Sequence, residues 1–211
     1  MTSIEATAAG SSSPGIWNLP NILTMLRIAL VPFFVWFLLA DAPGLRSESG
    51  PWRWAAVVAF AVAIYTDKLD GDIARSRGLV TNFGKIADPI ADKLLIGSAL
   101  VMLSILAELP WWVTIVVLVR EWGITALRFF VIRYGVIPAS RGGKLKTVVQ
   151  TAAIFLYLLP LGALAPWLVW VAFAVMMVAV LITVWTGVEY VIEALRVRSQ
   201  GKRAGKTTAG N

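Results

Sequence analysis

Five aspartates lie between residues 67 and 92 of a chain that is otherwise largely apolar. Four of them form two pairs, Asp67 with Asp70 and Asp88 with Asp92. Spacings of three and four residues place both members of a pair on one face of a helix. Two facing helices would therefore present four carboxylates to a shared space. A carboxylate at membrane depth costs roughly 2.5–3.5 kcal/mol on insertion scales, so this grouping calls for a chemical reason.

The chain contains neither histidine nor cysteine, so acid–base or metal chemistry at this site must rest on Asp, Glu, Lys, Arg, Tyr and hydroxyl groups. Converging carboxylates favour a hard divalent cation, Mg²⁺ or Mn²⁺, and one or two such ions can grip a diphosphate. Gly71 and Gly84 leave space for a bulky group beside the backbone, and Ala74 is also small. Arg75 can pair with a phosphate. Acid, glycine and arginine together predict phosphoryl or phosphatidyl transfer.

The elements that must position these residues are predicted to be membrane helices. The chain is 58% hydrophobic and 15% charged, with a mean hydropathy of +0.77, which indicates an integral membrane protein. We expect an all-α fold with six spans, each long enough for a hydrocarbon core of ~30 Å. The expected spans are 22–40, 53 to the break at Gly78, 82–106, 110–134, 144–164 and 166–195. Residues 1–16 and 197–211 are expected to be disordered tails around a membrane domain of residues 17–196.

Lysine and arginine concentrate after the second, fourth and sixth predicted spans, which places both termini and the aspartates on the cytoplasmic side. The opposite side has few cations, Arg46 and Arg53 in one loop. A tryptophan belt is expected there, made of Trp52, Trp54, Trp111, Trp112, Trp167 and Trp170. This topology accounts for the net charge of +7 better than nucleic-acid binding does.

The full pattern is Asp67-x₂-Asp70-Gly71-x₂-Ala74-Arg75-x₈-Gly84-x₃-Asp88-x₃-Asp92. It resembles the signature of the CDP-alcohol phosphotransferases. The resemblance implies a six-helix membrane fold, usually a homodimer, with a polar cavity open to the cytoplasm of a bacterial plasma membrane. It also implies a two-metal site on Asp67, Asp70, Asp88 and Asp92, with Asp92 as general base on the acceptor hydroxyl. The attack would fall on the β-phosphorus of a CDP-lipid, and CMP would leave. Asp72 lies outside the signature.

The resemblance further implies which residues bind the CDP-lipid. Gly71, Ala74, Arg75, Thr81 and Gly84 would line the nucleotide site. Residues 19–27 also resemble the family, and there Asn21 and Thr24 would contact the CDP group. Alternatively, Asn21 or Thr24 merely caps the first helix. Arg27 is either a ligand or an anchor whose charged end reaches the membrane surface.

The acceptor is expected to be recognised by two later stretches, residues 120–128 and 143–147. Arg120 and Arg128 share a helix face, while Lys144 and Lys146 begin the fifth span, where backbone N–H groups favour phosphate. With Arg141, they are our candidates for binding an acceptor phosphate. Alternatively, they are cytoplasmic charges without a ligand. Glu121 either orients Arg120 or forms a surface ion pair.

Both stretches resemble the phosphatidylglycerophosphate synthase branch of the family. That branch implies transfer from CDP-diacylglycerol to sn-glycerol 3-phosphate, giving phosphatidylglycerophosphate and CMP. Phosphatidylinositol phosphate synthase and cardiolipin synthase of the same family stay open as alternatives. A divalent-cation transporter would also place carboxylates in helices, but it would not need Gly71, Arg75 and Gly84 at these positions.

Overall fold

The computed structural model describes residues 18–77, 81–131 and 141–208, and within these ranges the chain forms helices and no strand. The predicted all-α class is therefore confirmed for the described residues. The elements are α1 (Leu19–Ala40), a 3-10 turn η1 (Pro43–Leu45), α2 (Pro51–Ser76), α3 (Asn82–Ile105), α4 (Trp111–Val131), α5 (Arg141–Leu158), the short α6 (Leu161–Leu164) and α7 (Trp167–Thr208).

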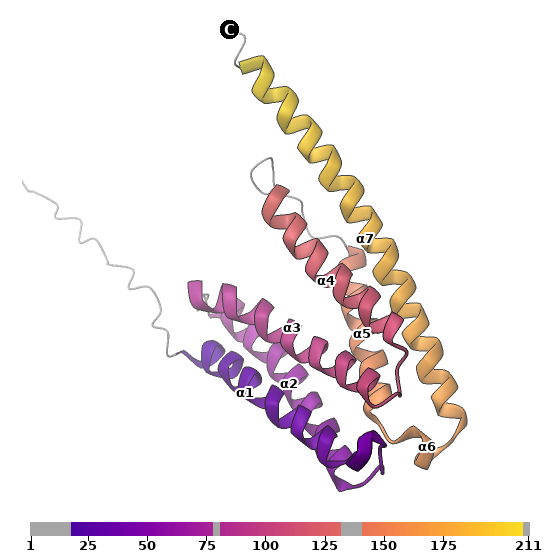
Figure 1. Ribbon diagram of the computed structural model, residues 1–211. Coiled ribbons are helices and arrows are strands. Elements are labelled where there is room, and N and C mark those ends of the chain that lie inside the picture. Colours follow the sequence, from indigo (N-terminus) through magenta and orange to yellow (C-terminus); the bar gives the residue numbers. More distant parts are fainter. Residues whose placement is uncertain (1–17, 78–80, 132–140, 209–211) are drawn as a thin grey trace, which may run out of the picture.

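The helices form two groups that pack against each other (Figure 1). In the first group, α1 lies along α2 and α3; in the second, α4 and α5 both pack on α7. Contacts of α3 with α4 and α5, and of α2 with α5, join the groups. One hydrophobic core runs through both, and α1 to α5 and α7 each contribute to it. Its fully buried members include Phe34, Phe60, Leu100, Val113, Ile154 and Met176.

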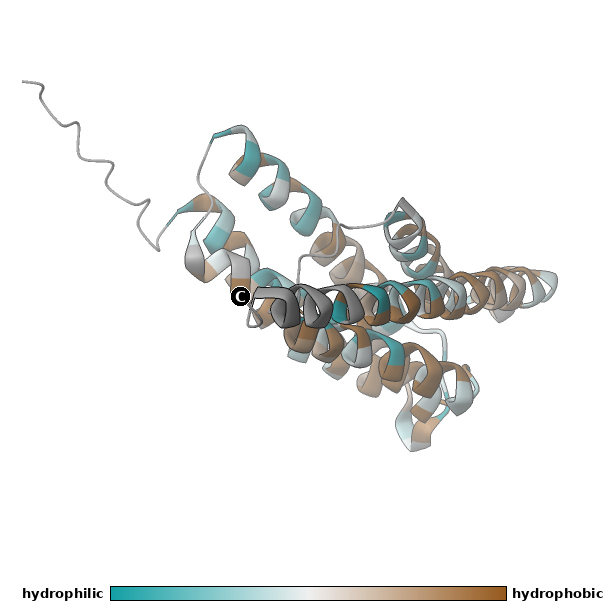
Figure 2. Ribbon diagram, turned by 90° about the horizontal axis from the view of Figure 1, so that it is seen from above, coloured by the Kyte–Doolittle hydropathy of each residue, from teal (hydrophilic) through white to brown (hydrophobic). Residues whose placement is uncertain are grey.

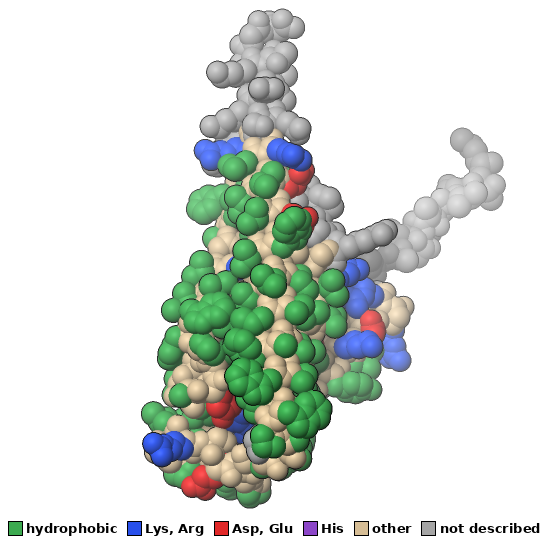
Figure 3. All heavy atoms as spheres, turned by 90° about the vertical axis from the view of Figure 1, so that its right-hand side faces the viewer, with side chains coloured by type: hydrophobic (Ala, Val, Ile, Leu, Met, Phe, Trp, Pro, Cys, Tyr) green, Lys and Arg blue, Asp and Glu red, His purple; other side chains and the backbone are tan. Residues whose placement is uncertain are grey.

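The outer surface of the bundle is apolar. Hydrophobic residues predominate along the helices (Figure 2), and in the face over α7 they cover the middle while charged side chains lie near the two ends (Figure 3). Large side chains such as Phe129, Trp170 and Leu181 are exposed. Among the described residues, α1 and Trp167–Arg198 of α7 are long and apolar enough to cross a membrane. Such a surface suits lipid better than water.

Local sequence explains where the helices begin. Asn18 caps α1, because its side chain accepts a hydrogen bond from the Asn21 N–H at 3.0 Å, and Pro20 occupies the first turn. Thr81 caps α3 in the same way, accepting from the Gly84 N–H at 3.0 Å. The Thr81 hydroxyl also donates to Asn21 of α1, so the two capped helix starts lie beside each other.

The second half of the chain differs from the sequence prediction in two places. The fifth helix ends at Leu158 rather than near residue 164, because Pro160 interrupts it and only the short α6 follows. The sixth helix does not end near Leu195: α7 continues to Thr208, so residues 197–208 are helical where a disordered tail was expected. No proline follows Pro166, and lysine, arginine and alanine there favour a helix. The predicted tail 1–16 lies outside the described residues.

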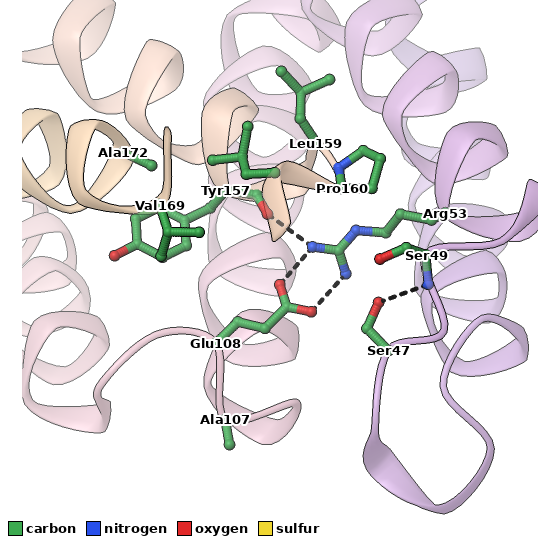
Figure 4. Close-up of a pocket in the computed structure, with 11 residues that line it drawn as sticks. Ser47, Ser49, Arg53, Ala107, Glu108, Tyr157, Leu159, Pro160, Val169 and Ala172 are labelled. Atoms are coloured by element: carbon green, nitrogen blue, oxygen red, sulfur yellow. Dashed lines mark hydrogen bonds and ion pairs between the residues drawn. The ribbon is translucent and has the colours of Figure 1, made fainter. Parts of the chain in front are cut away.

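Arg53 was expected in an outer loop, but it lies in the first turn of α2 and is buried. Its Nη1 donates to Glu108 Oε1 at 2.9 Å and its Nη2 to the Tyr157 carbonyl at 2.7 Å (Figure 4). Its Nε donates to the Leu158 carbonyl at 2.7 Å. Burial raises the pKa of the Glu108 carboxyl, and the Arg53 guanidinium acts in the opposite direction. Arg53 therefore ties α2 to the α3–α4 loop and to the end of α5.

A cavity of about 330 Å³ lies beside Arg53 and Glu108, at the end of α2 remote from the aspartates. Its wall also includes Ser47, Tyr157 and Val169 (Figure 4). The charged groups that face it already bind one another and the backbone. These contacts hold this end of the bundle together, and the aspartates lie at the other end.

Candidate active site

Arg27 of α1 joins the first two aspartates. Its Nη1 donates to Asp67 Oδ1 and its Nη2 donates to Asp70 Oδ2. Both hydrogen bonds connect α1 with α2. The Arg27 side chain is only 1% exposed, so it is no anchor reaching the membrane surface. Its Nε is buried and has no hydrogen-bond partner. A buried cation that bridges two carboxylates offsets their mutual repulsion.

Thr24, one turn before Arg27, connects α2 with α3. Its hydroxyl donates to Asp88 Oδ1 at 2.6 Å and lies 3.4 Å from Asp70 Oδ2. Since Asn18 is the cap of α1, the capping alternative for Thr24 is wrong. Through Arg27 and Thr24, α1 gathers three of the four predicted metal ligands, Asp67, Asp70 and Asp88.

The other predicted CDP contacts cluster beside Asp88. Thr81 Oγ1 donates to Asn21 Oδ1 at 2.9 Å. Because Asn18 caps α1, the capping alternative is wrong for Asn21 as well. A Cβ on Gly84 would lie 3.1 Å from Asn21 Oδ1 and 3.3 Å from Thr81 Oγ1. These contacts are closer than ordinary van der Waals separations, so only glycine fits here without displacing its neighbours.

The end of α2 carries the remaining nucleotide candidates, Gly71, Ala74 and Arg75. Gly71 and Ala74 are partly buried, whereas the Arg75 side chain is 72% exposed. Arg75 Nη2 donates to Asp72 Oδ1 at 2.9 Å, and its guanidinium folds over Gly71. Asp72, which lies outside the signature, therefore holds Arg75 at the surface end of the motif.

Asp92 lines two cavities. It lines a cavity of about 530 Å³ together with Arg27 and Asp67. It also lines a smaller polar pocket together with Glu121 and Lys146. Asp92 is thus placed between the carboxylate cluster and the predicted acceptor side.

Whether the residues fit a divalent metal can be judged from their donors. Within the described ranges, no three Asp or Glu side chains are arranged as a group that could hold a metal ion. Arg27 supplies the positive charge between Asp67 and Asp70 instead. The available ligand atoms nevertheless fit a hard cation, because they are carboxylate oxygens. Oxygens of Asp70 and Asp88 approach the same Thr24 hydroxyl, so these two carboxylates already lie close together. The predicted ligand set therefore stays a prediction.

Two of the five acceptor candidates converge on Glu121. Arg120 Nη1 donates to Glu121 Oε1 at 3.3 Å, and Lys146 Nζ of α5 donates to the same oxygen. The side chains of Arg120, Glu121 and Lys146 are mostly buried, so this is no surface ion pair. Glu121 holds the two cations next to each other, and Lys146 lines the smaller pocket that contains Asp92.

The other acceptor candidates lie farther out. Arg128 is exposed, with its guanidinium carbon 5.8 Å from the centre of the Tyr190 ring, and Lys144 is also exposed. The side chain of Arg141 lies outside the described part of the structure. Neither exposed residue is paired with Glu121 in the way that Arg120 and Lys146 are.

Sequence reasoning missed the part that α7 plays. Arg120 Nη2 donates to Thr186 Oγ1 at 3.1 Å, and a Cβ on the adjacent Gly187 would lie 3.2 Å from Arg120 Cγ. It also missed Lys93, whose ammonium donates to Thr125 and lies 5.1 Å from the centre of the Trp122 ring. Thr186 and Gly187 interrupt the apolar run of the predicted sixth span, and this was the sequence feature that could have indicated a polar contact with α7.

Comparison with known proteins identifies the family of this chain. Residues 17–185 match the model of the family described as CDP-alcohol phosphatidyltransferase. The chain belongs to this family. The family that the pattern at residues 67–92 resembles is thereby confirmed, and the CDP-alcohol phosphatidyltransferase domain covers the helices from α1 into α7.

Individual relatives are similar over nearly the same length. A probable phosphatidylglycerophosphate synthase of Mycobacterium tuberculosis is 54% identical over 181 residues, which are 86% of this chain and 83% of that protein. CDP-diacylglycerol–glycerol-3-phosphate 3-phosphatidyltransferase of Bacillus subtilis is 40% identical, covering 83% of this chain and 94% of its own. The protein of that name in Escherichia coli K12 is 34% identical, with 84% and 95% coverage.

Proposed function

We propose that this CDP-alcohol phosphatidyltransferase transfers the phosphatidyl group of CDP-diacylglycerol to sn-glycerol 3-phosphate. The products are phosphatidylglycerophosphate, a phospholipid precursor, and CMP. The observation that carries the proposal is the position of Asp92, which lines one cavity with Arg27 and Asp67 and another with Lys146. A base placed between a diphosphate site and an anion site suits attack by a phosphorylated alcohol. The names of the relatives support the same acceptor.

Members of the family generally use divalent metal ions. We assign two such ions, Mg²⁺ or Mn²⁺, to Asp67, Asp70, Asp88 and Asp92. When bound, such ions would neutralise the diphosphate of the donor and the charge that develops on the leaving CMP. The oxygen-only donor set and the approach of Asp70 and Asp88 to one hydroxyl support this assignment.

The CDP-lipid lies, in our proposal, along α1 and the facing ends of α2 and α3. Asn21, Thr24, Thr81 and Gly84 form one side of the nucleotide site. The last turns of α2 form the other, with Gly71, Ala74 and Arg75. The close contacts of Gly84 with Asn21 and Thr81 support a shaped site at this position.

Asp92 takes the proton of the acceptor hydroxyl. That oxygen bonds to the β-phosphorus of the donor, while the bond from this phosphorus to the bridging oxygen breaks and CMP leaves with that oxygen. Atoms and charge balance without an oxidant or a further reactant. Positioning rather than strong basicity gives Asp92 its effect, since the proton transfer is local.

The phosphate of the acceptor binds Arg120 and Lys146, which Glu121 holds side by side. Two cations of this kind form charge-assisted hydrogen bonds with a phosphate. Arg128, Arg141 and Lys144 would attract the anion nearer the membrane surface. When the phosphate binds, it would replace part of the contacts that Arg120 and Lys146 make with Glu121.

We further propose that six helices span a bacterial plasma membrane, with the polar cavity and both termini in the cytoplasm, and that two copies associate. The apolar outer surface and the two helices that qualify as spans support the membrane setting. The excess of lysine and arginine at the aspartate end supports the orientation.

An acceptor comparison tests the proposed function. Purified protein in detergent, with Mg²⁺ and CDP-diacylglycerol, is offered glycerol 3-phosphate, inositol 1-phosphate or phosphatidylglycerol, and CMP is measured. We expect CMP and phosphatidylglycerophosphate only with glycerol 3-phosphate. Release only with inositol 1-phosphate or phosphatidylglycerol would refute the acceptor. No release with any acceptor, together with metal flux in liposomes, would refute the enzyme and support a transporter.

A further inference from the structure

A small pocket between α3, α4 and α5 contains a buried amide oxygen, Gln150 Oε1, without a hydrogen-bond partner. It has a volume of about 30 Å³ and is lined by residues that include Asp92, Glu121, Lys146 and Gln150. Such a volume holds roughly one water molecule or one hydroxyl group. It cannot hold a whole phosphorylated alcohol in this conformation.

The pocket adjoins the larger cavity of about 530 Å³. Asp92, Ile96, Thr147 and Thr151 line both. An acceptor in the larger cavity could therefore extend one polar group into the small pocket past Asp92.

Gln150 gives this pocket an unused acceptor. Its side chain is 3% exposed, and its Oε1 is buried with no hydrogen-bond partner. A buried amide oxygen without a hydrogen-bond partner is destabilising, so a ligand that donates to it binds more tightly than one that does not. Gln150 lies one turn after Lys146 on α5, and both line the pocket.

We propose that Gln150 recognises the acceptor by accepting a hydrogen bond from the hydroxyl that does not react. This inference rests on the proposed function. Asp92 faces the reacting hydroxyl, and Gln150 Oε1 accepts from the neighbouring one inside the small pocket. The phosphate reaches Lys146 and Arg120 when Glu121 releases them, which widens the pocket beyond its present volume. The site therefore selects a phosphorylated diol over a phosphorylated alcohol that carries only the reacting hydroxyl.

The remaining cation of the wall does not compete for this role. The Lys93 ammonium donates to Thr125 and lies over the Trp122 ring, so it is held by α4. Gln150 is thus the group in the wall that offers a buried oxygen without a donor. A hydroxyl supplies that donor, whereas a phosphate oxygen cannot.

The test compares glycerol 3-phosphate with propane-1,3-diol monophosphate, which lacks the second hydroxyl. In the unaltered protein we expect kcat/KM for glycerol 3-phosphate to exceed that for the propanediol phosphate about tenfold or more. Equal values would overturn the proposal without any variant. Failure of the unaltered protein to use glycerol 3-phosphate, with turnover of inositol 1-phosphate, would overturn the proposed function instead.

Gln150→Leu and Gln150→Met then remove the oxygen while keeping the volume. Both variants should lose the preference, because kcat/KM falls about tenfold for glycerol 3-phosphate and stays unchanged for the propanediol phosphate. Thr183→Val is the control, since Thr183 Oγ1 is also buried without a partner but lies on α7 and does not line the pocket. It should keep the preference. An equal loss for both acceptors in the Gln150 variants would show a structural role and overturn the proposal.

Discussion

Arg120 lies against a glycine of α7, and replacing that glycine should shift the guanidinium without altering any ligand-binding group. A Cβ on Gly187 would lie 3.2 Å from Arg120 Cγ and 3.7 Å from its Nε. Ordinary carbon contacts begin at about 3.5 Å, so Arg120 must move by a few tenths of an ångström. The hydrogen bond to Thr186, next to Gly187, would be disturbed by the same movement.

The size of the effect follows from what Arg120 does in the proposed site. A guanidinium moved out of place loses a charge-assisted hydrogen bond to the acceptor phosphate, worth about 1.5–3 kcal/mol. This corresponds to a rise of about 10- to 150-fold in KM for glycerol 3-phosphate. Glycine to alanine inside a helix favours folding by roughly 0.5–1 kcal/mol, so unfolding does not explain a loss of activity.

Initial rates of CMP release, measured against each substrate in turn, test Gly187→Ala. KM should rise for glycerol 3-phosphate and stay within about twofold for CDP-diacylglycerol, given that one hydrogen bond is affected. Gly123→Ala is the control, because a Cβ there would meet nothing within 4 Å. A Gly187→Ala variant that behaves like Gly123→Ala would contradict a role of Gly187 in placing Arg120. An equal rise in KM for glycerol 3-phosphate and for CDP-diacylglycerol would contradict it as well.

Gly84→Ala should raise KM for CDP-diacylglycerol more than for the acceptor, because its Cβ would crowd Asn21 and Thr81; an unchanged KM in the same assay would contradict this. Arg53→Ala should lower the temperature of thermal unfolding, since removing one partner of a buried ion pair costs about 3–5 kcal/mol. Adding Glu108→Gln should recover part of that loss, and a further drop would count against the pairing. Treatment with a chelator should stop CMP release, with recovery on adding Mg²⁺ or Mn²⁺; an undiminished rate would contradict the metal assignment.

The sequence could predict the carboxylate cluster because helical periodicity is local. Spacings of three and four residues put Asp67 with Asp70 and Asp88 with Asp92 on common faces, and α2 and α3 have the predicted course through them. Periodicity does not say which partner faces a helix. It therefore left open whether Arg27 reaches the membrane surface, and only the packing of α1 on α2 places it between Asp67 and Asp70.

Contacts between distant segments account for most of what sequence reasoning missed. Arg53 was expected to be a loop charge because its partners, Glu108 and the Leu158 carbonyl, come much later in the chain. Thr186 meets Arg120 because α7 packs on α4. The end of α5 is a different case, since Pro160 was a readable stop signal that the long apolar run obscured.

Asp92→Asn tests whether Asp92 takes the proton of the acceptor hydroxyl. Asparagine keeps the size of the side chain but cannot take up a proton at neutral pH. Radiolabelled CDP-diacylglycerol binding and CMP release with glycerol 3-phosphate are measured on the same preparation. We expect the variant to bind the CDP-lipid within several-fold of the unaltered protein and to release no CMP above the background without acceptor. Turnover by Asp92→Asn at the rate of the unaltered protein would contradict the assignment of Asp92 as the general base.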